Sequence, residues 1–167
     1  IHGGTLSRSL QSISSVVPSG RTMPILLNFL MEVENEELKI TASDLETTIT
    51  VKLNPSMLEQ DQVNKIAIPA KMFLEVVNSL SSQQITVEVK ENYSIEITAG
   101  TGRYKLVGED PASYPTAIEL SDPALTTISS SVLVKAIGKT LFATGTGEMR
   151  PQMTGVLCEQ THNETIF

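Results

Sequence analysis

The chain is 167 residues long, 40% of its residues are hydrophobic, 19% are charged, and its formal net charge is −7. This length suits one ordinary domain, or one domain with part of a second. The acidic balance disfavours a free-standing protein that binds nucleic acid tightly, because such proteins are usually basic. One cysteine excludes an intramolecular disulfide, and no apolar run is long enough to span a membrane. We therefore expect a cytoplasmic protein without a membrane segment.

Two kinds of hydrophobic periodicity follow each other at the start of the chain. Apolar residues at helical spacing predict a helix over 5–17, with Thr5 or Ser7 near its N-cap. Strict alternation of apolar and polar residues then predicts three strands, over 29–33, 38–42 and 48–53.

The same order of elements then repeats. A strand ends at Ile68, and Pro69 opens a second helix whose apolar positions reach Leu80. Alternation again predicts three strands, over 85–90, 93–98 and 103–107. The pattern predicts an α+β fold of two helix-plus-strands units, with the helices on one face of antiparallel sheets.

A stretch with several prolines and little periodicity, residues 108–122, follows these units and is typical of a linker. We expect a first domain over 1–115, a linker over 116–127 and the truncated start of a second domain over 128–167.

The expected second domain opens like the first. The helical spacing of Leu133 and Ile137 predicts a third helix, and laid over the first helix these residues fall on Leu6 and Leu10. Such self-similarity indicates a repeat architecture. The repeat places a core strand after this helix, with Cys158 as a buried small hydrophobic residue in it.

Charge is segregated between helices and the rest of the chain. The first helix carries Arg8 and no acid, the third carries Lys135 and Lys139 and no acid, and the middle one carries Lys71 and Glu75. If the three helices share a surface, that surface is neutral to basic, and a polyphosphate would be its natural partner. The alternative interpretation is that these lysines only solvate exposed helices.

The other candidate motifs favour structural roles. The glycine-rich segments 100–102 and 145–147 lack the third glycine of a dinucleotide-binding loop. Asp44 and Glu46 could ligate a metal, but they lie between two strands, where a turn is the favoured interpretation. The two histidines suggest neither a zinc site nor a catalytic triad. We predict no catalytic residue, no metal and no cofactor.

Five segments, 24–26, 38–46, 68–71, 102–106 and 149–156, keep a recognisable order and spacing. Together they resemble the bacterial DNA sliding clamp, the beta subunit of DNA polymerase III, and the chain looks like an N-terminal fragment of it. The resemblance implies a head-to-tail homodimeric ring that encircles duplex DNA and tethers the polymerase, with helices lining the hole. It implies a processivity factor without a catalytic site, accessory to the DNA-directed DNA polymerase and loaded by a clamp loader.

The resemblance also suggests site residues. Lys71 matches a DNA-contacting position of the family, Arg150 lies in its second-domain DNA-contacting loop, and Arg21 stands one place from its usual arginine. The charge pattern adds three candidates, Arg8, Lys135 and Lys139. The family's subunit interface matches five residues, Met72, Val76, Leu80, Tyr104 and Leu106.

Two alternatives stay open at this point. The matched apolar residues could be ordinary core instead of interface, most of all Val76 and Leu80. The chain as a whole could be an acidic protein-interaction module that uses the same repeat without encircling DNA.

Overall fold

The computed structural model describes the whole chain except five segments, residues 21–22, 56–62, 116–124, 147–149 and 162–163. The chain divides into two compact units, Ile1–Ile118 and Glu119–Phe167, and each is described by itself. In the described residues, no helix is both long and apolar enough to cross a membrane.

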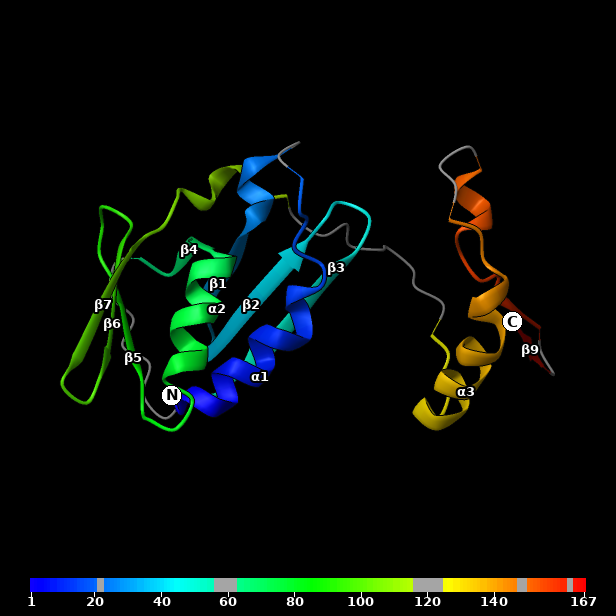
Figure 1. Cartoon of the computed structure of the whole chain (residues 1–167), viewed down its shortest axis with the longest axis horizontal. Coiled ribbons are helices and arrows are strands. Elements are labelled where there is room, and N and C mark those ends of the chain that lie inside the picture. Colours follow the sequence, from blue (N-terminus) through cyan, green and yellow to red (C-terminus); the bar gives the residue numbers. More distant parts are fainter. Residues whose placement is uncertain (21–22, 56–62, 116–124, 147–149, 162–163) are drawn as a thin grey trace. The chain divides into compact units, whose positions relative to one another are not determined.

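The described part of the first unit contains two antiparallel sheets and two α-helices (Figure 1). One sheet has the order β3-β2-β1-β4, with β1 Asn28–Glu34, β2 Glu37–Ser43, β3 Thr48–Leu53 and β4 Lys65–Pro69. The other has the order β5-β6-β7, with β5 Thr86–Val89, β6 Ser94–Ala99 and β7 Gly102–Val107. The helices are α1 Gly3–Ser14 and α2 Ala70–Ser79. The predicted α+β class is confirmed.

Helix α1 begins at Gly3, earlier than predicted, because His2 caps it. The imidazole Nδ1 of His2 accepts a hydrogen bond from the Gly4 backbone N–H at 3.2 Å. Thr5 and Ser7 lie inside the helix, so the predicted cap at either residue is wrong. A search for the usual capping residues, Ser, Thr, Asp and Asn, does not find a histidine cap.

The hairpin turns follow the local chemistry of their residues. Asn35 and Glu36 join β1 to β2 with φ values of 51° and 62°, the left-handed pair that suits a tight two-residue turn. Between β2 and β3, Asp44 Oδ1 accepts hydrogen bonds from the Glu46 N–H at 3.0 Å and the Thr47 N–H at 2.6 Å. Asp44 therefore stabilises a turn, which was the favoured interpretation of the sequence.

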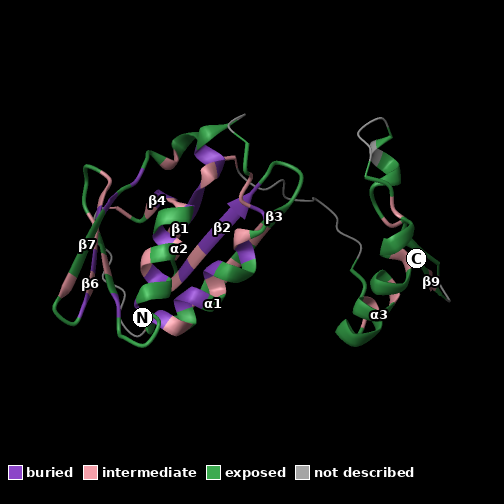
Figure 2. Cartoon of the chain, in the orientation of Figure 1, coloured by how far each residue is buried: buried purple, intermediate pink, exposed green. Residues whose placement is uncertain are grey.

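One apolar core lies between the helices and the sheets (Figure 2). Helix α1 packs against β2 and β3, while α2 packs against β1, β4 and β7. The most deeply buried side chains are Leu6, Leu10, Ile13, Phe29, Ile40, Ile68, Phe73, Val77, Ile85, Ile95 and Ile97. Because the apolar stripes of both helices enter this core, their polar sides stay exposed.

A second, smaller apolar cluster lies on the other face of the four-stranded sheet. It consists of Tyr114 with Ile25, Leu26, Leu30 and Ala67. The Tyr114 hydroxyl reaches the carbonyl oxygens of Asn28 and Thr41, each at 3.3 Å. Burial raises the pKa of Tyr114 to about 12. The cluster holds Tyr114, the residue directly after the 3₁₀ turn η2 Pro111–Ser113, on the sheet.

The second unit has a long helix and little sheet in its described residues. Its elements are α3 Ser130–Thr140, the 3₁₀ turns η3 Leu141–Ala143 and η4 Pro151–Met153, and the short strands β8 Glu159–Gln160 and β9 Thr165–Ile166. The predicted third helix is confirmed. The prediction for Cys158 is wrong, because this residue is exposed and precedes β8. A buried cysteine needs an apolar core around it, and α3 contributes no buried residue to such a core.

Candidate nucleic-acid interface

The exposed side of α1 and α2 forms a polar surface that we call the helix face. It is defined by the exposed polar side chains of the two helices, Thr5, Arg8, Gln11, Ser12, Lys71, Glu75, Asn78 and Ser79. Two of these residues are cationic and only Glu75 is anionic. The helix face therefore carries a small positive charge within a chain whose net charge is −7.

Neither cation of the helix face has an acidic partner in the part of the chain that the structure describes. Arg8 donates from Nε to the Gly4 carbonyl oxygen at 3.2 Å. No carboxylate of the described residues forms an ion pair with Arg8 or Lys71. Lys71 lies in the first turn of α2, where the helix dipole disfavours a positive charge. Helix stability does not explain these cations, so they are available to an external anion.

A cluster of hydrogen bonds joins the two helices beside these cations. Asn78 Oδ1 accepts hydrogen bonds from Ser7 Oγ at 2.6 Å and from Gln11 Nε2 at 3.1 Å. Ser7 is only 6% exposed, so its hydroxyl needs this partner. The cluster holds α1 against α2. Hydrophobic periodicity does not reveal this cluster, although a serine inside the apolar stripe next to Leu6 is a signal for it.

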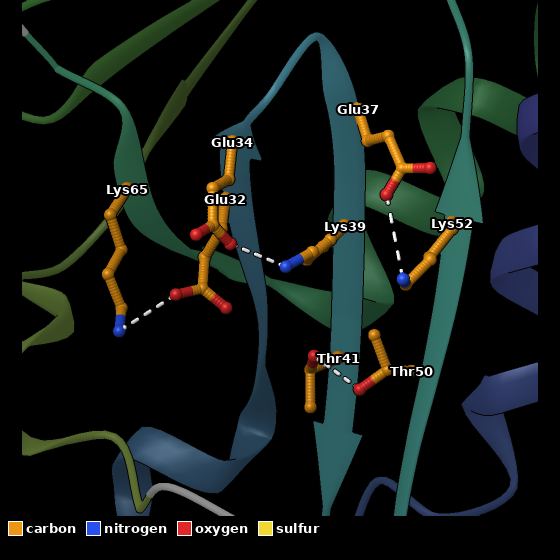
Figure 3. A network of polar contacts seen from close by, with 8 residues as sticks. All are labelled: Glu32, Glu34, Glu37, Lys39, Thr41, Thr50, Lys52 and Lys65. Atoms are coloured by element: carbon orange, nitrogen blue, oxygen red, sulfur yellow. Dashed lines mark hydrogen bonds and ion pairs between the residues drawn. The ribbon is translucent and has the colours of Figure 1, made fainter.

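Cations on the sheets are arranged differently, because most of them are paired with carboxylates. On the four-stranded sheet the pairs are Lys39–Glu34, Lys52–Glu37 at 3.6 Å and Lys65–Glu32 at 2.9 Å (Figure 3). On the other sheet Glu96 lies 3.6 Å from Lys90 and 3.7 Å from Arg103, and only Lys105 lacks a described partner. Among the described residues of the first unit, two of the three cations without an ion pair, Arg8 and Lys71, thus lie on the helices.

The second unit repeats this feature on α3. Lys135 and Lys139 are exposed one helical turn apart, and neither forms an ion pair with a described carboxylate. Arg150 is exposed just before η4. The remaining candidate, Arg21, lies outside the described residues. Five of the six predicted DNA-contacting cations are therefore exposed, three in the second unit and two in the first.

Residues 1–118 match a known family, described as the N-terminal domain of the DNA polymerase III beta subunit. The chain belongs to this family. It is 29% identical over 150 residues to the beta sliding clamp of Staphylococcus aureus, a match that covers 87% of this chain and 40% of the relative. The beta sliding clamp of Staphylococcus epidermidis matches to the same extent. The chain thus spans about 40% of the length of these curated relatives.

Solved structures of clamps share the fold. The sliding clamp of Pseudomonas aeruginosa superposes with a TM-score of 0.87 at 27% identity, over 96% of this chain and 43% of that one. The clamp of Bacillus subtilis gives a TM-score of 0.82 at 26% identity, over 90% of this chain and 41% of that one. The resemblance found in the sequence, and the clamp fold that it implied, are confirmed.

The residues matched to the clamp family's subunit interface fall into two groups. Met72 is 54% exposed and Tyr104 is 36% exposed, and Val76 is partly buried against the core. Leu80 and Leu106 are 3% and 6% exposed and belong to the core cluster. Of the two interpretations that the sequence allowed, core or interface, Leu80 and Leu106 thus fit the core, because their side chains are buried in the main cluster. Met72, Tyr104 and Val76 keep part of their side chains on the surface.

The described residues show no constellation typical of catalysis. No group of three or more His, Cys, Asp or Glu residues gathers as a possible metal site among them. A hollow of about 530 Å³ in the second unit is lined by residues such as Thr140, Met153 and Cys158, and its side chains are mainly apolar or hydroxylic. The cations of the helix face and of α3, which pair with no described carboxylate, can contact an anion.

Proposed function

We propose that this chain forms the first domain and the beginning of the second domain of a sliding clamp. In this function the clamp encircles duplex DNA as a homodimeric ring, and it tethers the replicative polymerase after a clamp loader has placed it. The observation that carries the proposal is the separation of cations within the described residues: those of the helices pair with no carboxylate, while those of the sheets are mostly paired. Membership of the clamp family supports it.

The physical basis is a loose contact with phosphates. Lys71, Arg8, Lys135, Lys139 and Arg150 would touch the DNA backbone, which carries no sequence information, so the ring could slide. Retention would come from the closed ring and not from affinity. A net charge of −7 is therefore compatible with a DNA-bound protein. No step of this function requires a catalytic group.

The ring needs contacts between subunits, and the exposed apolar residues of the first unit support one. Met72 and Tyr104, with the partly buried Val76, would form the first-domain side of the interface. Leu80 and Leu106 would support this surface from the core.

Retention on closed and open DNA tests the proposal. The full-length protein that carries this chain should stay on nicked circular DNA after loading, and it should dissociate when a nuclease linearises the circle. Equal retention on both forms would contradict encirclement and favour the alternative, an acidic module that recruits proteins.

Charge substitutions test the helix face separately. In the full-length protein, Lys71→Gln and Lys135→Gln should each weaken DNA binding and lower the slope of log affinity against log salt by about 0.9 for each phosphate that is no longer neutralised. Lys52→Gln is the matched control, because it removes the same charge from a paired lysine of the four-stranded sheet. If the control changes the slope as much as Lys71→Gln does, the helix face is not the DNA surface.

A further inference from the structure

The face of the four-stranded sheet that points away from α1 and α2, which we call the outer sheet face, carries a row of lysines. In the strand register Lys65 of β4 lies opposite Glu32 of β1, Glu32 lies opposite Lys39 of β2, and Lys39 lies opposite Lys52 of β3. Their neighbours Met31, Val33, Leu38, Ile40, Val51, Leu53 and Ile66 belong to or pack on the core. Since side chains alternate along a strand, the four charged residues share the outer sheet face (Figure 3).

Three of the four residues in this row are cations. Neighbouring strands are about 4.8 Å apart, so the row crosses the sheet over roughly 14 Å. Lys39 and Lys52 stand directly opposite each other, an arrangement that like charges disfavour. Without neutralisation, this row would be a denser group of lysines than the helix face, where Arg8 and Lys71 stand on separate helices.

Carboxylates neutralise each lysine of the row individually. Glu32 pairs with Lys65 at 2.9 Å within the row. Glu34 and Glu37 lie opposite each other in the next row, and they reach diagonally to Lys39 and Lys52. The outer sheet face thus presents three carboxylates and three ammonium groups in contact, as Figure 3 shows.

Stability does not account for two of these pairs. Glu34 of the Lys39 pair and Lys52 of the Glu37 pair are both 61% exposed, and ion pairs in such positions add little to folding. Pairing would instead act on the binding of a polyanion. A lysine binds DNA because it replaces counterions of the phosphates, and a lysine already held by a carboxylate brings no net charge for that exchange.

We propose that Glu32, Glu34 and Glu37 are specificity-determining residues that mask Lys65, Lys39 and Lys52 from DNA. They leave the helix face as the surface of the first unit that duplex DNA contacts. The inference rests on the proposed function in that DNA is taken as the ligand. It adds that the acidic residues of the outer sheet face select which side of the domain DNA touches.

The test is a gain of binding. The variant Glu32→Gln/Glu34→Gln/Glu37→Gln unmasks the lysines, and its affinity for a short linear duplex is measured against salt by fluorescence anisotropy, with the 167-residue chain. If all three lysines gain a phosphate contact, the slope of log affinity against log salt becomes steeper by about 2.7. Lowering the salt from roughly 0.2 M to roughly 0.05 M should then raise affinity about 40-fold more than for the unsubstituted chain.

The matched control changes the net charge equally at exposed acids that pair with no described lysine. This control is the variant Glu46→Gln/Glu88→Gln/Glu109→Gln. It should leave the slope close to that of the unsubstituted chain. Adding Lys39→Gln, Lys52→Gln and Lys65→Gln to the unmasked variant should abolish the gain, whereas adding Lys71→Gln should not.

Three results would overturn the proposal. These are an unmasked variant that gains no binding, an equal gain in the matched control, and a gain that Lys71→Gln abolishes. The double variant Glu34→Gln/Glu37→Gln keeps the test decisive if the triple variant folds poorly, because both side chains are exposed, and its slope should become steeper by about 1.8. Since the duplex is linear, this gain does not depend on ring closure. A failed retention experiment on circular DNA therefore remains a separate result.

Discussion

Tyr114 connects the end of the first unit to its main sheet, and its removal should change stability with opposite signs at neutral and alkaline pH. At neutral pH, Tyr114→Phe removes a buried hydroxyl whose single proton is shared between two carbonyl oxygens, each 3.3 Å away. Losing this shared hydrogen bond and leaving the carbonyl oxygens without it should cost about 1–2 kcal/mol of stability.

At alkaline pH the same buried hydroxyl lowers the stability of the folded chain. Burial raises the pKa of Tyr114 from 10 to about 12, because it withholds water from the tyrosinate, and a backbone hydrogen bond from Ser43 offsets only part of this effect. The unfolded chain loses this proton first, so stability falls as pH rises through the interval between these values. The loss attributable to Tyr114 should reach about 1.4 kcal/mol at pH 11 and about 2 kcal/mol at pH 12.

The free energies of unfolding of the variant and of the unsubstituted chain should therefore become equal near pH 11–12. Below this pH the unsubstituted chain should be the more stable of the two, and above it the variant should be. Urea unfolding followed by circular dichroism at pH 7, 10, 11 and 11.5 measures the difference, and comparing the two chains cancels the titration of lysines. Tyr104→Phe, which removes the hydroxyl of a more exposed tyrosine on β7, is the control and should show no crossing. A difference between Tyr114→Phe and the unsubstituted chain that stays constant from pH 7 to pH 11.5 would refute the argument from burial.

Two further predictions concern the contact between the helices. Gly3→Ala places a Cβ 2.2 Å from the carbonyl oxygen of Leu80, so α1 must move from the end of α2, and the urea midpoint should fall by the equivalent of about 2–3 kcal/mol. Ser7→Ala removes the buried hydroxyl that binds Asn78, and it should cost about 1 kcal/mol by the same measurement.

Each of these has a control on a helix of the same chain. Gly138→Ala in α3 adds a Cβ with no atom within 4 Å, and it should stabilise that helix by about 0.5–1 kcal/mol. Ser12→Ala removes an exposed hydroxyl that bonds only within α1, to Ser9, and its effect should stay within about 0.5 kcal/mol. The packing described for these helices would be contradicted if Gly3→Ala left the urea midpoint unchanged. It would also be contradicted if Ser12→Ala lowered the midpoint as much as Ser7→Ala does.

Local patterns in the sequence were sufficient to predict most helices and strands and the sign of the charge that each one carries. Period-two alternation located β1 to β3 and β5 to β7, and helical spacing located α1, α2 and α3. Arg8, Lys71, Lys135 and Lys139 could be assigned to helices without a structure. These properties depend on residues a few positions apart, which a periodicity reports directly. The family resemblance, carried by motifs in order, could be read in the same way.

The pairing of distant residues was decided only by the tertiary structure. Whether Leu80 and Leu106 are core or surface depends on which helix covers which strand, and the contact of Ser7 with Asn78 joins residues 71 positions apart. The same holds for the masked lysines, because the diagonal between Glu37 and Lys52 exists only once β2 and β3 have taken their register. Spacing along the chain shows that a residue is charged, whereas strand register and helix packing determine whether its charge is free.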